Sequence, residues 1–190
     1  MTGMHALWIP IVVSAVAIFV VSSIIHMMLD KVIPWHNKDY QHVPQQDAVM
    51  NALRPFNIPP GDYLLPRPDS MADMRSAEFL DKLNKGPKLV MTVMPNGMTG
   101  MGRNLGFWFV YLLVVNVFAG YVTGRALPPG ADYLHVFRFA GTTVFLGMSL
   151  ALWQASIWFQ KSLGTTIRST IDGVIFALIA GGIFGYFWPR

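Results

Sequence analysis

The stretch IDGVIFALIAGGIFGYFW, residues 171–188, constrains the fold of this chain most strongly. It is apolar almost throughout, and Gly173, Ala177, Gly181 and Gly185 recur at every fourth position. A helix would gather these four small residues into one continuous ridge. Membrane helices pack through such ridges, because lipid tails are as apolar as leucine and close backbone contact supplies the attraction instead. The stretch therefore predicts a membrane-spanning helix.

Composition supports a membrane protein and excludes several function classes. The 190 residues are 53% hydrophobic and 13% charged, which is more apolar than an ordinary soluble domain. The formal net charge is +4, but the basic residues alternate with acidic ones in one segment, so no nucleic-acid partner is expected. The chain contains no cysteine, which excludes disulfides, iron–sulfur clusters and thiol nucleophiles.

Four apolar stretches are long enough to cross a bilayer. We expect transmembrane helices over residues 7–29, 104–124, 139–159 and 171–188, with residues 30–103 forming a small polar, membrane-proximal subdomain. Capping and turn signals in that subdomain predict short helices over residues 45–53 and 71–83, and short strands over residues 63–65 and 88–94. The predicted fold class is an all-α membrane protein with a small mixed α/β polar segment between helices 1 and 2.

The distribution of lysine and arginine predicts the orientation in the membrane. Nine of these residues lie in segment 30–103 and two more lie in the loop at 160–170, whereas the opposite side has three. Because cytoplasmic loops carry an excess of Lys and Arg, we expect residues 30–103 in the cytoplasm and both termini outside.

A second small-residue ridge occurs in the third apolar stretch. Its members, spaced by four, are Thr143, Gly147, Ala151 and Ala155. Two antiparallel ridges can lie against each other, and short connections make consecutive helices neighbours. We therefore expect the third and fourth helices to form the closest pair, with both ridges in their contact.

Polar groups in the predicted spans are few. Asp172 is expected at the start of the fourth helix, where a capping box with Ser169 and the helix dipole would account for it. Uncharged polar residues are expected at similar depths on several helices: Ser22, Tyr111, Asn116 and Gln154. Such groups hydrogen-bond between membrane helices. A quinone or pigment pocket is the alternative interpretation.

The positions of the histidines indicate whether the chain could bind a metal or a haem. His36, Asp39 and His42 form an H-x2-D-x2-H pattern of possible ligands, but the spacing matches no strong zinc signature. A b-type haem needs paired histidines at equal depth, whereas His26 is expected at the inner end of a span and His135 on the outer side. We therefore expect no metal, no cofactor and no catalytic residue; nucleophile-elbow, Walker and HExxH motifs are all absent.

Several segments together resemble a known group of proteins. They are WHNKDY after the first span, NIPPGDYLLP, VMPNGMTGMG before the second span, VFRFAGTTVF, and STIDGVIFALIAGGIFGYFWPR. The combination is similar to small bacterial four-span inner-membrane proteins with no assigned activity. This resemblance implies a bacterial inner-membrane location and the four-span plan, and it transfers no catalytic or binding residue.

The leading functional hypothesis is a non-catalytic accessory, structural or assembly subunit of a larger bacterial membrane complex, respiratory or photosynthetic, with integral-membrane protein partners. One alternative is a small transporter, channel or lipid-handling protein acting as a homo-oligomer, although the sequence offers hardly any polar lumen. Another is a membrane enzyme with a metal at His36, Asp39 and His42.

Overall fold

The computed structural model describes residues 1–98 and 100–190 and divides the chain into two compact units. The first unit comprises residues 1–41 and 100–190, and the second comprises residues 42–99. Within the described residues, four helices are long and apolar enough to cross a membrane, and all four belong to the first unit. The predicted fold class is confirmed: the chain is an all-α, multi-pass membrane protein with a small polar segment between its first two spans.

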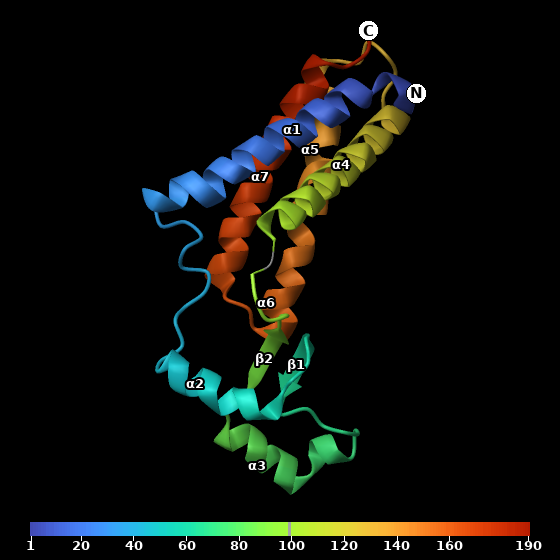
Figure 1. The fold of residues 1–190 in the computed structure, drawn as a ribbon. Coiled ribbons are helices and arrows are strands. Elements are labelled where there is room, and N and C mark those ends of the chain that lie inside the picture. Colours follow the sequence, from blue (N-terminus) through green and yellow to red (C-terminus); the bar gives the residue numbers. More distant parts are fainter. Residues whose placement is uncertain (99) are drawn as a thin grey trace. The chain divides into compact units, whose positions relative to one another are not determined.

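The four spans differ in their regularity (Figure 1). The first joins α1 (Trp8–Ser23) to a turn of π-helix (Ile24–Met28), and the second is α4 (Met101–Ala126). The third contains α5 (Tyr133–Ser149), a 3-10 turn (Leu150–Leu152) and α6 (Trp153–Phe159), and the fourth is α7 (Leu163–Tyr186). Breaks of these kinds inside a helix often accompany functional sites.

The third and fourth spans begin earlier than their hydropathy predicted. Helix α5 starts at Tyr133 rather than 139, because the Asp132 carboxylate accepts a hydrogen bond from the Leu134 backbone N–H and caps the helix. Helix α7 starts at Leu163 rather than 171. Its first turns are polar, so hydropathy alone does not detect that they are part of the helix.

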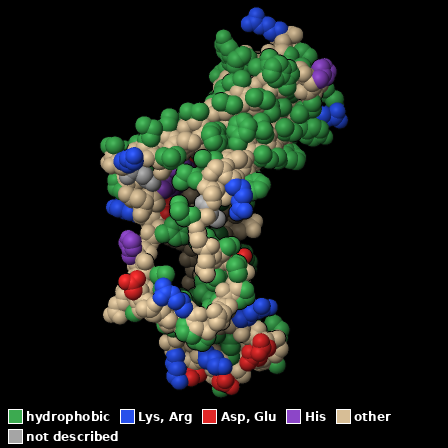
Figure 2. Space-filling model, in the orientation of Figure 1, with side chains coloured by type: hydrophobic (Ala, Val, Ile, Leu, Met, Phe, Trp, Pro, Cys, Tyr) green, Lys and Arg blue, Asp and Glu red, His purple; other side chains and the backbone are tan. Residues whose placement is uncertain are grey.

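Each span turns one face toward a common core and the other outward. In α1 the buried residues follow a helical period, Ile11, Ala15 and Ile18, and α7 buries Phe176, Ala180 and Phe184 in the same way. Large apolar side chains also cover much of the outer surface of this unit in the view of Figure 2. A surface of this kind suits surrounding lipid.

Helices α5 and α7 make the most extensive contact of any pair of elements in the described chain. The α7 ridge lies in this contact. A Cβ atom added to Gly181 would lie 2.8 Å from the Phe137 carbonyl oxygen, and one added to Gly185 would lie 2.6 Å from the Tyr133 ring. Only glycine permits these approaches, so the two backbones pack as membrane helices with small residues do.

The α5 side of the contact differs from the prediction. Helix α5 presents Tyr133, Phe137 and Gly141 to α7, whereas Gly147 faces Val115 of α4. A residue two positions from Gly141 points about 200° away around a helix, so the ridge that begins at 143 lies on another face. The expectation that the third-span residues Thr143, Gly147, Ala151 and Ala155 would meet α7 as one ridge is wrong: Gly147 faces α4, and the 3-10 turn Leu150–Leu152 interrupts the spacing of the four.

Both chain termini are fastened at the same end of the bundle (Figure 1). The Thr2 N–H donates to the Gly124 carbonyl at 2.7 Å, and the Gly130 N–H donates to the Pro189 carbonyl at 2.8 Å. The Trp188 indole adds a hydrogen bond to the Pro128 carbonyl at 3.0 Å. These bonds satisfy backbone groups that four antiparallel spans leave at their ends.

The second unit contains two short helices, α2 (Gln46–Leu53) and α3 (Ala77–Lys85), and two strands, β1 (Gly61–Leu65) and β2 (Leu89–Val93). The strands pair antiparallel, with Gly61 opposite Val93 and Leu65 opposite Leu89. The helix expected over residues 71–83 is shorter. Ser70 caps only a 3-10 turn, and Ser76 accepts the Phe79 N–H to start α3.

Replacing Gly181 by alanine should destabilise the bundle, because the new methyl group would meet the Phe137 backbone. We expect a loss of about 1–3 kcal/mol, as is usual for overpacking. The matched control is Gly182→Ala, whose Cβ would meet only the Tyr133 hydroxyl at an ordinary 3.6 Å. Thermal unfolding in detergent measures both. Equal unfolding temperatures for the two variants would show that the α5–α7 contact is not as close as described.

Candidate functional site

Asp172 is a carboxylate buried inside a membrane-spanning helix. It is 4% exposed and lies about two and a half turns into α7, so the expectation that it caps the helix start is wrong. The loop that follows the first span supplies its partners. Trp35 Nε1 donates to one carboxylate oxygen at 3.0 Å, and His36 Nε2 donates to the other at 2.6 Å.

His36 bridges two carboxylates. Its Nδ1 donates to Asp39 Oδ2 at 2.7 Å while its Nε2 donates to Asp172. Arg168, one turn before Asp172 in α7, donates from Nε to Asp39 Oδ1 at 3.0 Å. An ionised carboxylate only accepts, so with Asp39 and Asp172 both ionised the two imidazole nitrogens donate and the ring is an imidazolium. We call Trp35, His36, Asp39, Arg168 and Asp172 the His36 network.

The network shifts the ionisation of its loop residues. Burial opposes the charge on His36, but its hydrogen bonds to Asp39 and Asp172 and the charges of both carboxylates outweigh burial and raise the pKa of His36 above its ordinary 6.5. Burial alone would raise the pKa of Asp39, yet hydrogen bonds from His36 and Arg168 lower it below its ordinary 3.8. Both residues are therefore held in their charged forms.

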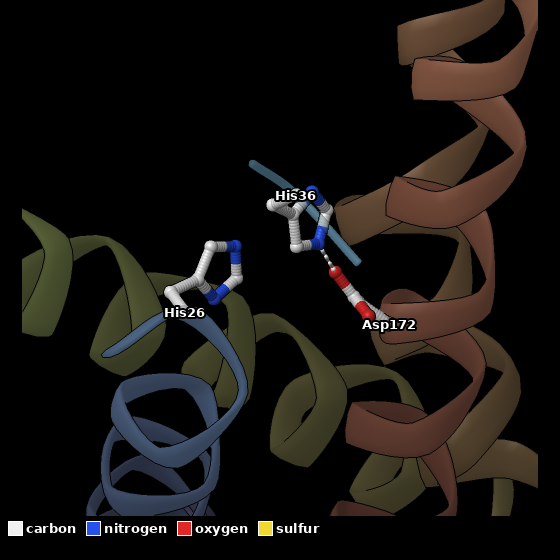
Figure 3. A group of neighbouring side chains, drawn as sticks. All are labelled: His26, His36 and Asp172. Atoms are coloured by element: carbon white, nitrogen blue, oxygen red, sulfur yellow. Dashed lines mark hydrogen bonds and ion pairs between the residues drawn. The ribbon is translucent and has the colours of Figure 1, made fainter. Parts of the chain in front are cut away.

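His26 reaches the network from the π-helical turn at the end of α1 (Figure 3). Its ring stacks on that of His36, with centroids 4.4 Å apart and planes only 8° from parallel. Its Nδ1 donates to the Ser22 carbonyl at 2.8 Å. A carbonyl accepts only, so Nδ1 carries a proton, and in the neutral form of the ring Nε2 is then an acceptor.

His26, His36 and Asp172 offer ligand atoms within 4.8 Å of one another, which is close enough to consider a metal. The geometry fits poorly, because an imidazole binds metal in its ring plane and two stacked, parallel rings direct their lone pairs along planes that do not converge. His36 also uses both nitrogens on carboxylates. The sequence pattern suggested a different ligand set, His36, Asp39 and His42. In the structure His36 and Asp39 form an ion pair with each other, and His42 belongs to the second unit.

A cavity of about 530 Å³ opens beside Asp172, among α4, α7 and the end of α5. One part of its lining is polar and comprises His26, Asn104, Ser169 and Asp172; the larger part is aromatic and apolar and comprises Phe107, Trp108, Tyr111, Met148, Leu152, Gly173 and Phe176. An adjoining cavity of about 330 Å³ shares His26, Asn104 and Trp108 with it. A mostly apolar cavity with a few convergent polar groups is typical of a small-molecule site.

The predicted polar layer does not form as one layer. Ser22 accepts a hydrogen bond from Trp108 Nε1 at 3.0 Å, and the Tyr111 hydroxyl donates to the Gly147 carbonyl at 2.8 Å. These are two separate contacts, between α1 and α4 and between α4 and α5. Gln154 lies on the exposed surface.

Asn116 also hydrogen-bonds within its own helix rather than between helices. Its amide nitrogen donates to the Leu112 carbonyl of its own helix at 2.9 Å. Its oxygen is buried without a hydrogen-bond partner among the described residues. Asn116 is therefore a local helix contact rather than part of the cavity.

Sequence reasoning singled out His36 and Asp39 but not their partners across the chain. Arg168 and Asp172 lie more than 120 residues away from His36 and Asp39 in the sequence. The available signal was a carboxylate set next to an apolar run, with an arginine four positions before it on the same helical face.

Comparison with known proteins does not identify the chain: no protein-family model, curated protein or solved structure matches it. What the site can do follows from its own atoms. It combines a paired charge network at one end of a bundle with a cavity that joins polar and aromatic walls.

The His36 network should make stability depend on pH. Because the pKa of His36 is raised on folding, its contribution is complete below 6.5 and is lost as pH rises through the folded-state value. Because the pKa of Asp39 is lowered, its contribution is complete above 3.8 and is lost as pH falls through the folded-state value. Between pH 3.8 and pH 6.5, His36 and Asp39 therefore both make their full contribution to the free energy of unfolding.

We expect His36→Gln to cost roughly 1.5–3 kcal/mol at pH 6, the usual value of hydrogen bonds to charged groups. The difference from the wild type should shrink as pH rises above 6.5. The control is His135→Gln, an exposed histidine at the end of the bundle where the termini lie. Unfolding temperatures in detergent across this pH range measure the effect. A difference that stays constant with pH would argue against a charged His36.

Proposed function

We propose that this protein is a non-catalytic accessory or assembly subunit of a larger bacterial inner-membrane complex, with integral-membrane proteins as partners. The second unit carries the main support. Among its described residues, Phe79 is the one buried large hydrophobic side chain, whereas many others are exposed. A unit of this size with so little core is marginal by itself, and exposed apolar surface commonly marks an interaction site.

The clearest exposed surface lies on α2 and the 3-10 turn that follows it. Val49, Leu53 and Phe56 recur at the spacing of one helical face, and they are 39%, 43% and 72% exposed. We call these three residues the α2 strip. Its flanking charges are few, Asp47 and Arg54, so it lacks the basic face of a helix that lies on anionic lipid. This composition favours a protein partner.

Internal features of the membrane unit agree with a structural role. The charged side chains next to the cavity pair with one another through the His36 network. In the described spans, the hydrogen bonds of Ser22 and Tyr111 connect neighbouring helices and that of Asn116 stays within α4, so these groups form separate contacts rather than a continuous polar path. These observations favour an accessory role over the transporter and enzyme alternatives.

The proposed orientation has both termini outside and the second unit in the cytoplasm. Its support is the excess of Lys and Arg in segment 30–103. Because the chain lacks cysteine, a single cysteine introduced at position 5 or 62, both exposed, can be labelled without background. A membrane-impermeant maleimide should label position 5 alone in intact cells, and labelling of position 62 alone would reverse the orientation.

The partner hypothesis is tested by a photo-crosslinking amino acid at position 56 in native membranes. We expect one discrete adduct with a second membrane protein, which should also co-purify in stoichiometric amount after mild detergent extraction. The control position is Glu78, a polar and exposed residue of α3 in the same unit.

Replacing the α2 strip by Val49→Gln, Leu53→Gln and Phe56→Gln should abolish both the adduct and the co-purification while leaving the bundle folded. Adducts only with lipid or with the chain's own helices would contradict the proposal. So would a protein that migrates alone in several mild detergents.

A further inference from the structure

The cavity beside Asp172 has the size and lining of a site for an amphipathic molecule. Its volume of about 530 Å³ falls in the range of small-molecule sites. Its lining extends along α4 from Asn104 to Tyr111, which corresponds to about 10 Å of helix. A molecule inside would therefore have one end among polar groups and the rest among rings.

At the polar end of the cavity, neither Asp172 nor the neutral His26 ring offers a free hydrogen-bond donor. Both Asp172 oxygens already accept hydrogen bonds, from Trp35 and His36. His26 donates its Nδ1 proton to the Ser22 carbonyl, so in the neutral form of the ring its Nε2 presents a lone pair. The Asn104 amide, which has no side-chain hydrogen bond within the described chain, stands in the same lining. The Asn104 amide and the Ser169 hydroxyl can each donate or accept, whereas Nε2 of the neutral His26 ring can only accept, so a headgroup that hydrogen-bonds to His26 must bring a donor such as a hydroxyl.

The charges at this end also limit the ligand. His36 is charged, but it lies between Asp39 and Asp172, and Arg168 neutralises Asp39 in turn. The four charges of the His36 network thus balance one another, so an ionic headgroup would find no unmatched counter-charge within that network. An uncharged headgroup therefore has the smallest desolvation cost on entering this site.

The apolar part favours a flat ring with a lipid-soluble body. Trp108 and Tyr111 stack with centroids 5.4 Å apart and, with Phe107 and Phe176, form an aromatic wall. Phe107 is 67% exposed and Leu152 is 38% exposed on the outer surface of the unit. Because that surface faces lipid, an apolar chain attached to the ring could leave the cavity between α4 and the end of α5.

We propose that this cavity binds an uncharged, lipid-soluble hydroxylated ring of the quinol class, with a ring hydroxyl donating to Nε2 of His26. The aromatic wall holds the ring, and Asn104 contacts its polar edge. The assignment concerns binding alone, and it does not depend on the protein partner proposed above.

The experiment compares two probes that differ only in their donors. Protein in nanodiscs is equilibrated by anaerobic dialysis with tetramethylhydroquinone or with the dimethyl ether of the same ring, and empty nanodiscs correct for partition into lipid. We expect saturable one-to-one binding of the hydroquinone, about tenfold tighter than the ether, since one net hydrogen bond corresponds to about that factor. The oxidised quinone, which has no donor, should also bind more weakly.

The matched variants are His26→Phe, which keeps a flat ring against His36 but lacks Nε2, and His135→Phe at the end of the bundle with the termini. The first should lose about tenfold in affinity and the second should not change. Asn104 is exposed, so Asn104→Leu provides a second test in a residue outside the His36 network. Equal binding of hydroquinone and ether, tighter binding of the quinone, or unchanged affinity in His26→Phe would overturn the proposal.

Discussion

The structure depends on the cost of burying one carboxylate. Asp172 is buried where α7 passes from its polar first turns into apolar sequence, and an isolated charge there would lose its hydration without compensation. The loop after the first span provides the compensation, because Trp35 and His36 each form a hydrogen bond to one of the two Asp172 carboxylate oxygens. His36 in turn needs Asp39, and Asp39 needs Arg168. These linked hydrogen bonds and ion pairs hold the loop against the beginning of α7 and determine where residues 35–39 can lie.

Two kinds of contact hold α7, and together they shape the cavity. Along most of its length, α7 packs against α5 through backbone approaches that glycine permits at 141, 181 and 185. Near its start the contact is ionic and comes from the loop. The bundle closes tightly on the α5 side and remains open toward α4, where the cavity lies. Helix irregularities border this opening, namely the π-helical turn that carries His26 and the 3-10 turn after Ser149.

Hydropathy and small-residue spacing were enough to predict four spans and the face that α7 turns to its neighbour. They failed where a residue's role depends on partners far away in sequence. Asp172 looked like a helix cap, since an apolar run begins beside it, but α7 starts nine residues earlier in polar sequence. The third-span ridge failed because its residues lie on a different face from Gly141. His36 and Asp39 were recognised as polar candidates, yet loop residues carry no period that could indicate which helix they meet.

The central claim is that His36 and Asp172 form an energetically coupled, partly buried ion pair that fastens the loop to α7. A double-mutant cycle with His36→Gln and Asp172→Asn, measured by reversible unfolding in detergent at pH 6, tests it most directly. The account predicts that the two single substitutions are far from additive, with a coupling free energy of about 1–3 kcal/mol, as for residues in one hydrogen-bonded network. A coupling energy indistinguishable from zero would show that the two side chains do not interact, and would contradict the account.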